Sequence, residues 1–291
     1  MLEDSPHQKI DTVLQKLEQA FAGGDIAAAV NLFQEDCYWR DLVTLTWNLR
    51  TMEGHDQIRE MLQAQLTTIK PNDFRQDLNE TATEDDGVVQ GWIEFETKTA
   101  RGYGHIRLKN GLIWTLLTTM YELKGYEEPR GFMRPMGAQH GSDPHRKSWS
   151  EKRAQEEAEL GHSIQPYCVI VGGGQGGIAL GARLRQLGVP TIIIERNERP
   201  GDSWRKRYKS LCLHDPVWYD HLPYIPFPDN WPVFAPKDKI GDWLEMYTKV
   251  MELNYWSSTT CKSATFDDAG GEWTIIVERE GQEVVLRPKQ L

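Results

Sequence analysis

The chain has 291 residues, of which 39% are hydrophobic and 26% are charged, and its formal net charge is −10. These proportions are those of a globular protein, and the length fits about two domains. The acidic balance, without a basic stripe, argues against nucleic acid as a partner. Apolar runs fall far short of the roughly 18 residues that a membrane-spanning helix needs, so we expect no membrane association.

The positions of the cysteines and histidines indicate whether the protein has disulfides or a metal site. The four cysteines are widely separated and form no C-x-x-C pair, and the histidines show no spacing typical of metal ligands. We therefore expect no disulfide framework and no metal site, and we expect a reducing cytoplasm as the location.

The first 130 residues predict an α+β domain that begins with helices. One helix is expected to begin at Ser5-Pro6 and to end at Gly23-Gly24. Asp25 is expected to cap a second helix. The inward face of that helix is predicted to carry Ile26, Val30 and Phe33.

Strand signals dominate the rest of this domain. The segment from Cys37 to Leu49 is strand-like, a further helix carries apolar residues between Ile58 and Ile69, and strands are expected from Phe74 to Leu123. Asn110-Gly111 separates two apolar runs and predicts a hairpin. This order of elements, over residues 8–128, resembles the NTF2/SnoaL-like cone fold, in which a curved sheet wraps a helix and leaves a pocket.

The resemblance suggests which residues line such a pocket. The candidates are Trp39, Arg40, Asp41 and Trp47, with Asp41 as a candidate catalytic acid beside aromatic side chains. The alternative, which we favour, makes Asp41 a paired surface carboxylate and the two tryptophans core residues. Sheet faces of this fold often pair, so the resemblance also implies a possible homodimer.

Residues 131–165 differ in composition from both neighbours. Proline and glycine interrupt regular structure here, and Ser150 to Leu160 predicts a charged helix. We interpret 131–165 as a linker between the domain formed by 1–130 and a second domain formed by 166–291.

The second domain opens with a nucleotide-binding pattern. The β-branched run Tyr167 to Val171 leads into a glycine motif and a helical pattern, and a second strand, Thr191 to Ile194, ends on Glu195. This βαβ arrangement is the dinucleotide fingerprint of Rossmann-type domains. The candidate phosphate-binding residues are Gly172, Gly173, Gly174, Gln175, Gly176 and Gly177.

Each position in the motif has a physical task. Gly172 permits the tight turn, Gly174 lets a pyrophosphate approach the backbone, and Gly177 lets the helix pack close to the strand. The N-terminus of the helix offers free N–H groups to phosphate. Glu195 is placed to accept hydrogen bonds from ribose hydroxyls, and an acid there favours FAD or NAD over NADP.

The sequence after Glu195 resembles the class B flavin-dependent monooxygenases, especially the YUCCA-type indole-pyruvate monooxygenases. The matching elements are Glu195-Arg196, the G-x-x-W element from Gly201 to Trp204, and the Tyr-x-x-Leu-x-Leu-His element from Tyr208 to His214. The resemblance covers residues 166 to about 260. The further cofactor-binding residues that it implies are Arg196, Ser203, Trp204, Tyr208 and His214.

The resemblance implies an α+β NTF2-like domain followed by an α/β Rossmann-type FAD-binding domain in an FAD- and NADPH-dependent monooxygenase. Such an enzyme transfers oxygen from O2, through a C4a-peroxyflavin, to a small organic substrate, and His214 is expected to be catalytic beside the flavin. The family continues with a second glycine motif for NADPH. We therefore expect this chain to be an N-terminal fragment with an incomplete FAD domain, inactive alone, whose NADPH site lies in a missing C-terminal part.

Two alternatives remain at this point. The first is an NAD-dependent oxidoreductase that uses the stretch from Gly172 to Glu195, although the G-x-x-W element and His214 argue against it. The second is a non-catalytic binding or dimerisation module with a partial nucleotide site. Trp204 as a core aromatic and His214 as a structural histidine are the simpler alternatives for those two residues.

Overall fold

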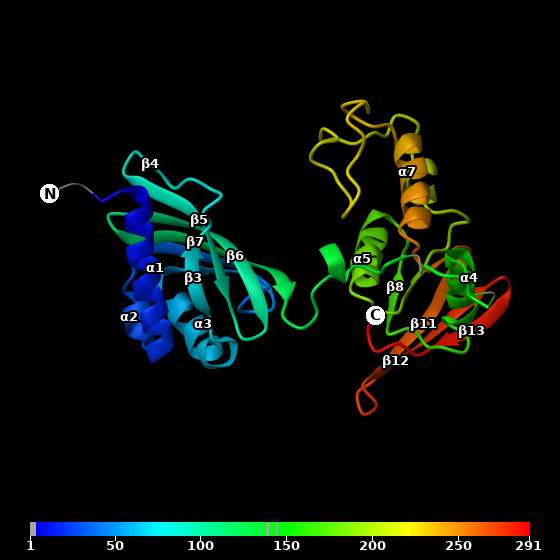
Figure 1. Cartoon of the computed structure of the whole chain (residues 1–291), viewed down its shortest axis with the longest axis horizontal. Coiled ribbons are helices and arrows are strands. Elements are labelled where there is room, and N and C mark those ends of the chain that lie inside the picture. Colours follow the sequence, from blue (N-terminus) through cyan, green and yellow to red (C-terminus); the bar gives the residue numbers. More distant parts are fainter. Residues whose placement is uncertain (1–3, 138–139, 144) are drawn as a thin grey trace. The chain divides into compact units, whose positions relative to one another are not determined.

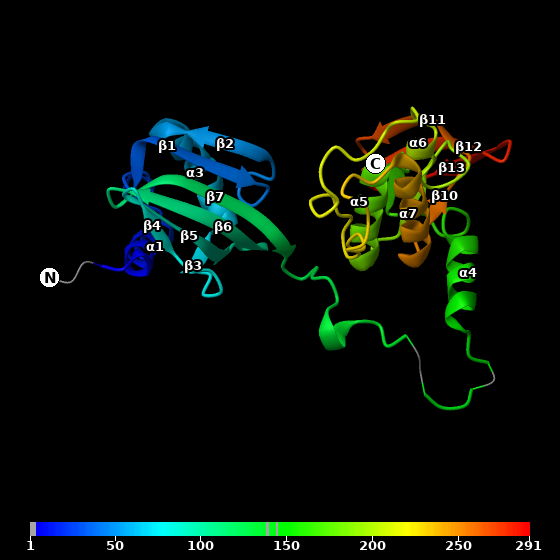
Figure 2. The same ribbon diagram turned by 90° about the horizontal axis from the view of Figure 1, so that it is seen from above.

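The computed structural model describes residues 4–137, 140–143 and 145–291, and it divides into two compact units, Met1–Glu127 and Glu128–Leu291 (Figures 1 and 2). Residues 138–139 and 144, which fall in the expected linker, lie outside the described residues.

The N-terminal unit is a curved sheet covered by helices (Figure 1). Strand order is β2-β1-β7-β6-β5-β3, with β4 beside β5; β1 and β7 are parallel, and the other pairs are antiparallel. The elements are α1 (Pro6–Gly23), α2 (Ile26–Val30), β1 (Phe33–Leu42), β2 (Leu49–Glu53), α3 (Gly54–Ile69), β3 (Asn72–Gln76), β4 (Thr83–Asp85), β5 (Val88–Glu96), β6 (Ala100–Lys109) and β7 (Leu112–Leu123).

Helix α1 has the boundaries that the sequence predicts. The Ser5 hydroxyl accepts the N–H of Gln8, and the Gln8 side chain accepts the N–H of Ser5, which satisfies two donors at the start of the helix. Gly24 ends the helix with a φ of 66°, a left-handed conformation that glycine adopts without strain. Asp25 caps α2, as predicted. Phe33 was expected on that helix; it is instead a buried residue of β1.

The expected strand from Cys37 to Leu49 is wrong in its second half. Strand β1 ends at Leu42, the chain turns, and β2 returns antiparallel to β1. Asp41 causes this turn: its carboxylate accepts the N–H groups of Leu45 and Thr46 and the Thr46 hydroxyl. A further hydrogen bond comes from the Thr118 hydroxyl on β7, at 2.8 Å.

These contacts and the burial of the side chains also test the pocket lining that the resemblance suggested. Asp41 is fully buried, so it is neither a pocket acid nor a surface carboxylate. Trp39 is a core residue whose ring stacks on Phe33 and whose Nε1–H donates to Thr118. Trp47 is 53% exposed and is not part of the core. The side chains of Trp39, Asp41 and Trp47 therefore do not surround one cavity, and this expectation is wrong.

The second unit contains a parallel sheet and an antiparallel sheet. The parallel sheet has the order β10-β9-β8, and the antiparallel sheet has the order β11-β12-β13. The elements are η1 (Gly131–Met133), α4 (Trp149–Glu159), β8 (Cys168–Val171), α5 (Gln175–Gln186), β9 (Thr191–Ile194), α6 (Asp202–Arg205), α7 (Lys237–Val250), β10 (Tyr255–Trp256), β11 (Thr259–Asp267), β12 (Glu272–Arg279) and β13 (Gln282–Leu286).

Both faces of the parallel sheet are buried. Ile170 and Ile193 pack with residues of α5 and α7, whereas Val169 and Ile192 pack with the antiparallel sheet. Alternate residues of a strand point to opposite faces, so the continuous apolar runs of β8 and β9 are what a sheet covered on both sides requires. Helix α4 confirms the sequence prediction, whereas α7 and β10 were not predicted. None of the helices in the described segments combines the length and hydrophobicity needed to cross a bilayer.

We predict that Asp41→Ala lowers the free energy of unfolding by about 3 kcal/mol, because it leaves several buried donors without an acceptor. Urea unfolding followed by tryptophan fluorescence measures the change. Asp36→Ala is the matched control, since Asp36 is an exposed carboxylate on the same strand. An Asp41→Ala variant as stable as the control contradicts the assigned role.

Candidate functional site

The glycine motif forms the turn between β8 and α5. Gly172 has a φ of 110° and donates its N–H to the carbonyl of Ile194, which joins the turn to β9. A Cβ on Gly177 would clash with the carbonyl oxygen of Gly172, so glycine is required for the helix to start this close to the strand. The local geometry thus matches the structural tasks that the sequence pattern implies for these two glycines.

Glu195 holds this turn from the end of β9. Its side chain is buried, and one carboxylate oxygen accepts the N–H of Gly173 at 2.8 Å. The other oxygen accepts the backbone and side-chain N–H groups of Asn197, at 2.9 and 2.7 Å. The carboxylate therefore organises the glycine turn in addition to any contact with a ligand.

Tyr255 supports the same turn from β10. Its hydroxyl donates to the carbonyl of Gly173 at 2.9 Å, and a Cβ on Gly173 would clash with that hydroxyl. Burial, and then the nearby charge of Glu195, raise the pKa of Tyr255, so the phenol stays protonated and remains a donor. The Gly173 peptide is thus held on its N–H side by Glu195 and on its carbonyl side by Tyr255.

Helix α6, which carries Ser203 and Trp204, is fixed by charge. Arg205 donates to Asp202 at 3.1 Å, and it also bonds Asp242 and Glu245 on α7, at 2.9 and 2.7 Å. Burial alone would raise the pKa of Asp202, but hydrogen bonds from Arg205 and Lys206 lower it. Asp202 therefore stays ionised in its buried position and anchors the helix.

A cavity of about 350 Å³ lies where α5 and α6 meet the segment after α6. Across it, the Trp204 Nε1–H donates to the side-chain oxygen of Gln175 at 3.0 Å. The residues that line the cavity are Gly174, Gln175, Ser203, Trp204, Arg207, Leu211, Cys212, Leu213 and His214.

The cavity brings together five of the residues expected from the sequence: Gly174, Gln175, Ser203, Trp204 and His214.

The other expected residues lie elsewhere. Arg196 and Tyr208 are exposed and do not line the cavity. The remaining expected residues support the turn or lie beside it: Gly172, Gly173, Gly176, Gly177 and Glu195.

Sequence reasoning missed several contributors to the site. Arg207, Leu211 and Cys212 line the cavity, and they belong to the sequence segment on which the resemblance rests. Their place in that segment could have indicated that they belong to the site. Tyr255 carried no signal, because it reaches Gly173 across 82 positions of sequence. Among the described residues, no group of His, Cys, Asp and Glu side chains has the arrangement of a metal site.

The site has free donors that suit an anionic cofactor. Gly174 is the N-cap of α5 and provides no side-chain cap, so the N–H groups of the first turn lack an intrahelical acceptor. The Ser203 hydroxyl oxygen is buried and has no hydrogen-bond partner among the described residues. A Cβ on Gly174 would lie 3.8 Å from that oxygen, so the two residues face each other. The diphosphate of a dinucleotide would satisfy these donors.

Comparisons with known proteins identify relatives of this chain. Residues 14–116 match the model of the SnoaL-like domain. The chain is 36% identical over 117 residues to the probable indole-3-pyruvate monooxygenase YUCCA9 of Arabidopsis thaliana. The aligned segment covers 40% of this chain and 28% of that protein. The chain is also 36% identical over 136 residues to indole-3-pyruvate monooxygenase YUCCA1 of Oryza sativa subsp. japonica. That alignment covers 46% of this chain and 32% of the rice protein.

The chain contains a SnoaL-like domain and is homologous to class B flavin-dependent monooxygenases. The resemblance inferred from the sequence is thereby confirmed, and these relatives are oxidoreductases. The chain spans 28–32% of the length of the two curated relatives. A flavin-containing monooxygenase from Stenotrophomonas maltophilia is a solved structure with a TM-score of 0.38 and 22% identity, covering 42% of this chain and 36% of that one.

We predict that Gly177→Ala destabilises the second unit by about 2 kcal/mol, because the new methyl group meets a backbone carbonyl that cannot move aside. Gly176→Ala is the control: a Cβ there meets nothing within 4 Å, and alanine favours a helix. Thermal unfolding followed by circular dichroism compares the two. Equal melting temperatures for the two variants contradict the close approach of α5 to β8.

Proposed function

We propose that the second unit binds FAD in the cavity between α5 and α6. The observation that carries this proposal is the buried Ser203 hydroxyl, which has no partner in the described part of the chain and faces Gly174 at the start of α5. Such a site offers hydroxyl and N–H donors to a diphosphate, and the helix dipole adds positive potential there. In this arrangement Gly174, Gln175 and Ser203 hold the diphosphate.

The remaining expected residues have defined places in the same proposal. Glu195, already bonded to Gly173, would orient the glycine turn and accept ribose hydroxyls with its remaining lone pairs. Trp204, held by Gln175, would pack its ring along the cofactor. Arg196 and Tyr208 are exposed and would contact the cofactor only from the rim.

We further infer that the chain is part of an FAD- and NADPH-dependent monooxygenase that acts on a small organic substrate with O2. The bound flavin would supply the redox chemistry. The homology to proteins named indole-3-pyruvate monooxygenases supports this reaction class. His214 lines the cavity with an exposed imidazole, so it is placed to exchange a proton with bound cofactor or substrate. The N-terminal unit would mediate self-association.

An NAD-dependent oxidoreductase is the second candidate, because the observed turn is compatible with it. The turn and Glu195 have the geometry that either dinucleotide uses. A binding experiment distinguishes the two candidates, because a site for NAD does not bind FAD in preference to NAD⁺.

We predict that Gly174→Ala weakens FAD binding by at least about tenfold, since the methyl group occupies space that the diphosphate needs. Quenching of flavin fluorescence on titration with the protein measures the affinity, with NAD⁺ as a competitor. The fold should be unaffected, because a Cβ at Gly174 meets nothing closer than 3.8 Å.

Gly23→Ala is the matched control for this experiment, because it adds a methyl group into open space in the other unit. Wild-type FAD affinity in Gly174→Ala would remove the phosphate-binding assignment. Full displacement of FAD by equimolar NAD⁺ would favour the second candidate.

We also predict that His214→Ala leaves the melting temperature and the FAD affinity unchanged but diverts NADPH oxidation in the active enzyme toward hydrogen peroxide. The imidazole is exposed, so its loss creates no buried cavity. Peroxide formed per NADPH consumed is the readout, and His145→Ala removes an exposed linker histidine as the control. A lower melting temperature with unchanged peroxide yield would make His214 a structural residue.

A further inference from the structure

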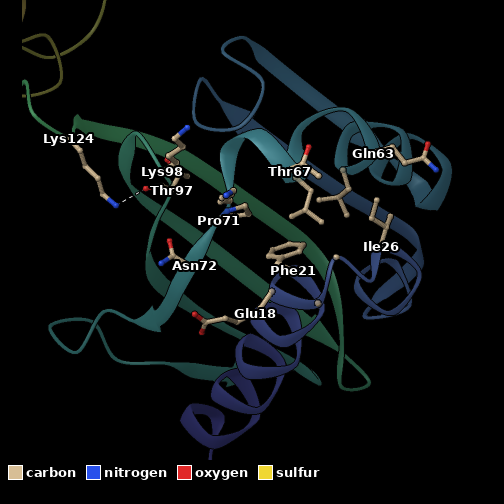
Figure 3. Close-up of a pocket in the computed structure, with 16 residues that line it drawn as sticks. Glu18, Phe21, Ile26, Gln63, Thr67, Pro71, Asn72, Thr97, Lys98 and Lys124 are labelled. Carbon is tan, nitrogen blue, oxygen red and sulfur yellow. Dashed lines mark hydrogen bonds between the residues drawn. The ribbon is translucent and has the colours of Figure 1, made fainter.

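A second cavity, of about 920 Å³, lies in the N-terminal unit (Figure 3). It is bounded by the C-terminal halves of α1 and α3, by α2, by the start of β3 and by the turn after β5. It is separate from the position expected from the sequence, where Trp39 fills the core. Its apolar wall is formed by Phe21, Ile26, Leu62, Leu66 and Pro71.

The opposite end of this cavity is basic. Lys70, Lys98 and Lys124 all line it. Lys124 is already engaged, because its ammonium group donates to the carbonyl of Thr97 at 2.6 Å and pairs with Glu96 at 2.7 Å. Lys70 and Lys98 are exposed, and neither forms an ion pair with any residue that the structure describes.

Glu18 is the acidic side chain of the lining, and it is also engaged: one of its carboxylate oxygens accepts the N–H of Asp73 at 2.7 Å. Figure 3 shows Glu18 and Asn72 on one side of the Phe21 ring, with Ile26 on the other. The lining therefore offers two cations that have no ion pair within the described segments, beside an apolar wall.

Backbone donors satisfy part of the carbonyl groups at the helix ends beside this cavity. Helices α1 and α3 both end here, and free carbonyls at a helix C-terminus favour cations. However, the carbonyl of Leu66 accepts the N–H of Lys70 at 3.0 Å, and the carbonyl of Ile69 accepts the N–H of Lys98 at 2.8 Å. The carbonyl of Ala20 accepts the N–H of Asp25. Three of the terminal carbonyls therefore already accept a backbone N–H, and the ammonium groups of Lys70 and Lys98 carry the positive charge at this end of the cavity.

We propose that this cavity binds a small organic acid with an apolar body, with its carboxylate at Lys70 and Lys98 and its body against Phe21 and Leu66. The volume is within the range of roughly 300–1,000 Å³ typical of small-molecule sites. A charge-assisted hydrogen bond to an ammonium group selects a carboxylate over a neutral group of the same shape. The proposal is independent of flavin binding in the other unit.

Three ligands that share one ring system test the charge selection. Calorimetric titration of the full 291-residue chain with 1-naphthoate, 1-naphthamide and 1-naphthylmethylamine should rank the acid as the tightest. The double variant Lys70→Gln/Lys98→Gln removes both ammonium groups, so it should weaken naphthoate by at least about tenfold and leave naphthamide unchanged.

The control Lys16→Gln/Lys109→Gln makes the same change in net charge at two exposed lysines that do not line the cavity. It should leave naphthoate affinity at the wild-type value. Equal weakening by both double variants would show a general charge effect and overturn the proposal. Tighter binding of the amine than of the acid would overturn it as well.

A filling variant tests the location. Gly23 lies on the cavity wall, and a Cβ there meets nothing within 4 Å. Gly23→Leu should therefore place its side chain in the cavity, keep the melting temperature, and weaken naphthoate and naphthamide alike by at least about tenfold. Wild-type affinity for naphthoate in a folded Gly23→Leu variant would show that the acid binds elsewhere.

Discussion

The hydrogen bond from the Gly173 N–H to the Glu195 carboxylate is the constraint on which the second unit's site depends. It joins the end of β9 to the turn that starts α5, and a buried polar group is stable only where hydrogen-bond partners surround it. With Gly173 fixed, Gly174 faces Ser203 and the first turn of α5 opens toward the cavity. The residue placed to contact a ribose thus also shapes the phosphate site, so loss of this carboxylate affects fold and ligand together.

Features that depend on neighbouring residues were predictable from the sequence. The caps of α1 and the turn at Gly172 follow from side chains within a few positions. Features that depend on distant contacts were not. Asp41 and Trp47 stand in a strand-like run, but a hydrogen bond from Thr118, 77 positions away, helps to hold Asp41 buried where the chain turns. Tyr255 is likewise recognisable as part of the site only through its contact with Gly173.

The cavities of the two units lie in different kinds of place. In the N-terminal unit, aromatic rings fill the space between helices and sheet, since Trp39 packs on Phe21 and Phe33 and Phe74 stacks on Phe95. Close packing of this kind fills the space around these rings, and the cavity of about 920 Å³ lies instead at the ends of α1 and α3. In the second unit, glycine keeps side chains out of the turn, and the space lies beside the backbone itself.

One consequence follows from the position of β8 in its sheet. On one side β8 pairs with β9, and on the other the described residues contribute only a short parallel bridge between Cys168 and Gln290. The N–H of Val169 donates to the carbonyl of Gln290, and the carbonyl of Tyr167 accepts the N–H groups of Lys289 and Gln290. Because these residues are far apart in the sequence, their contact closes a long loop and has a substantial cost in chain entropy. Amide hydrogen exchange at Val169 therefore reports whether residues 289–290 are docked on the sheet.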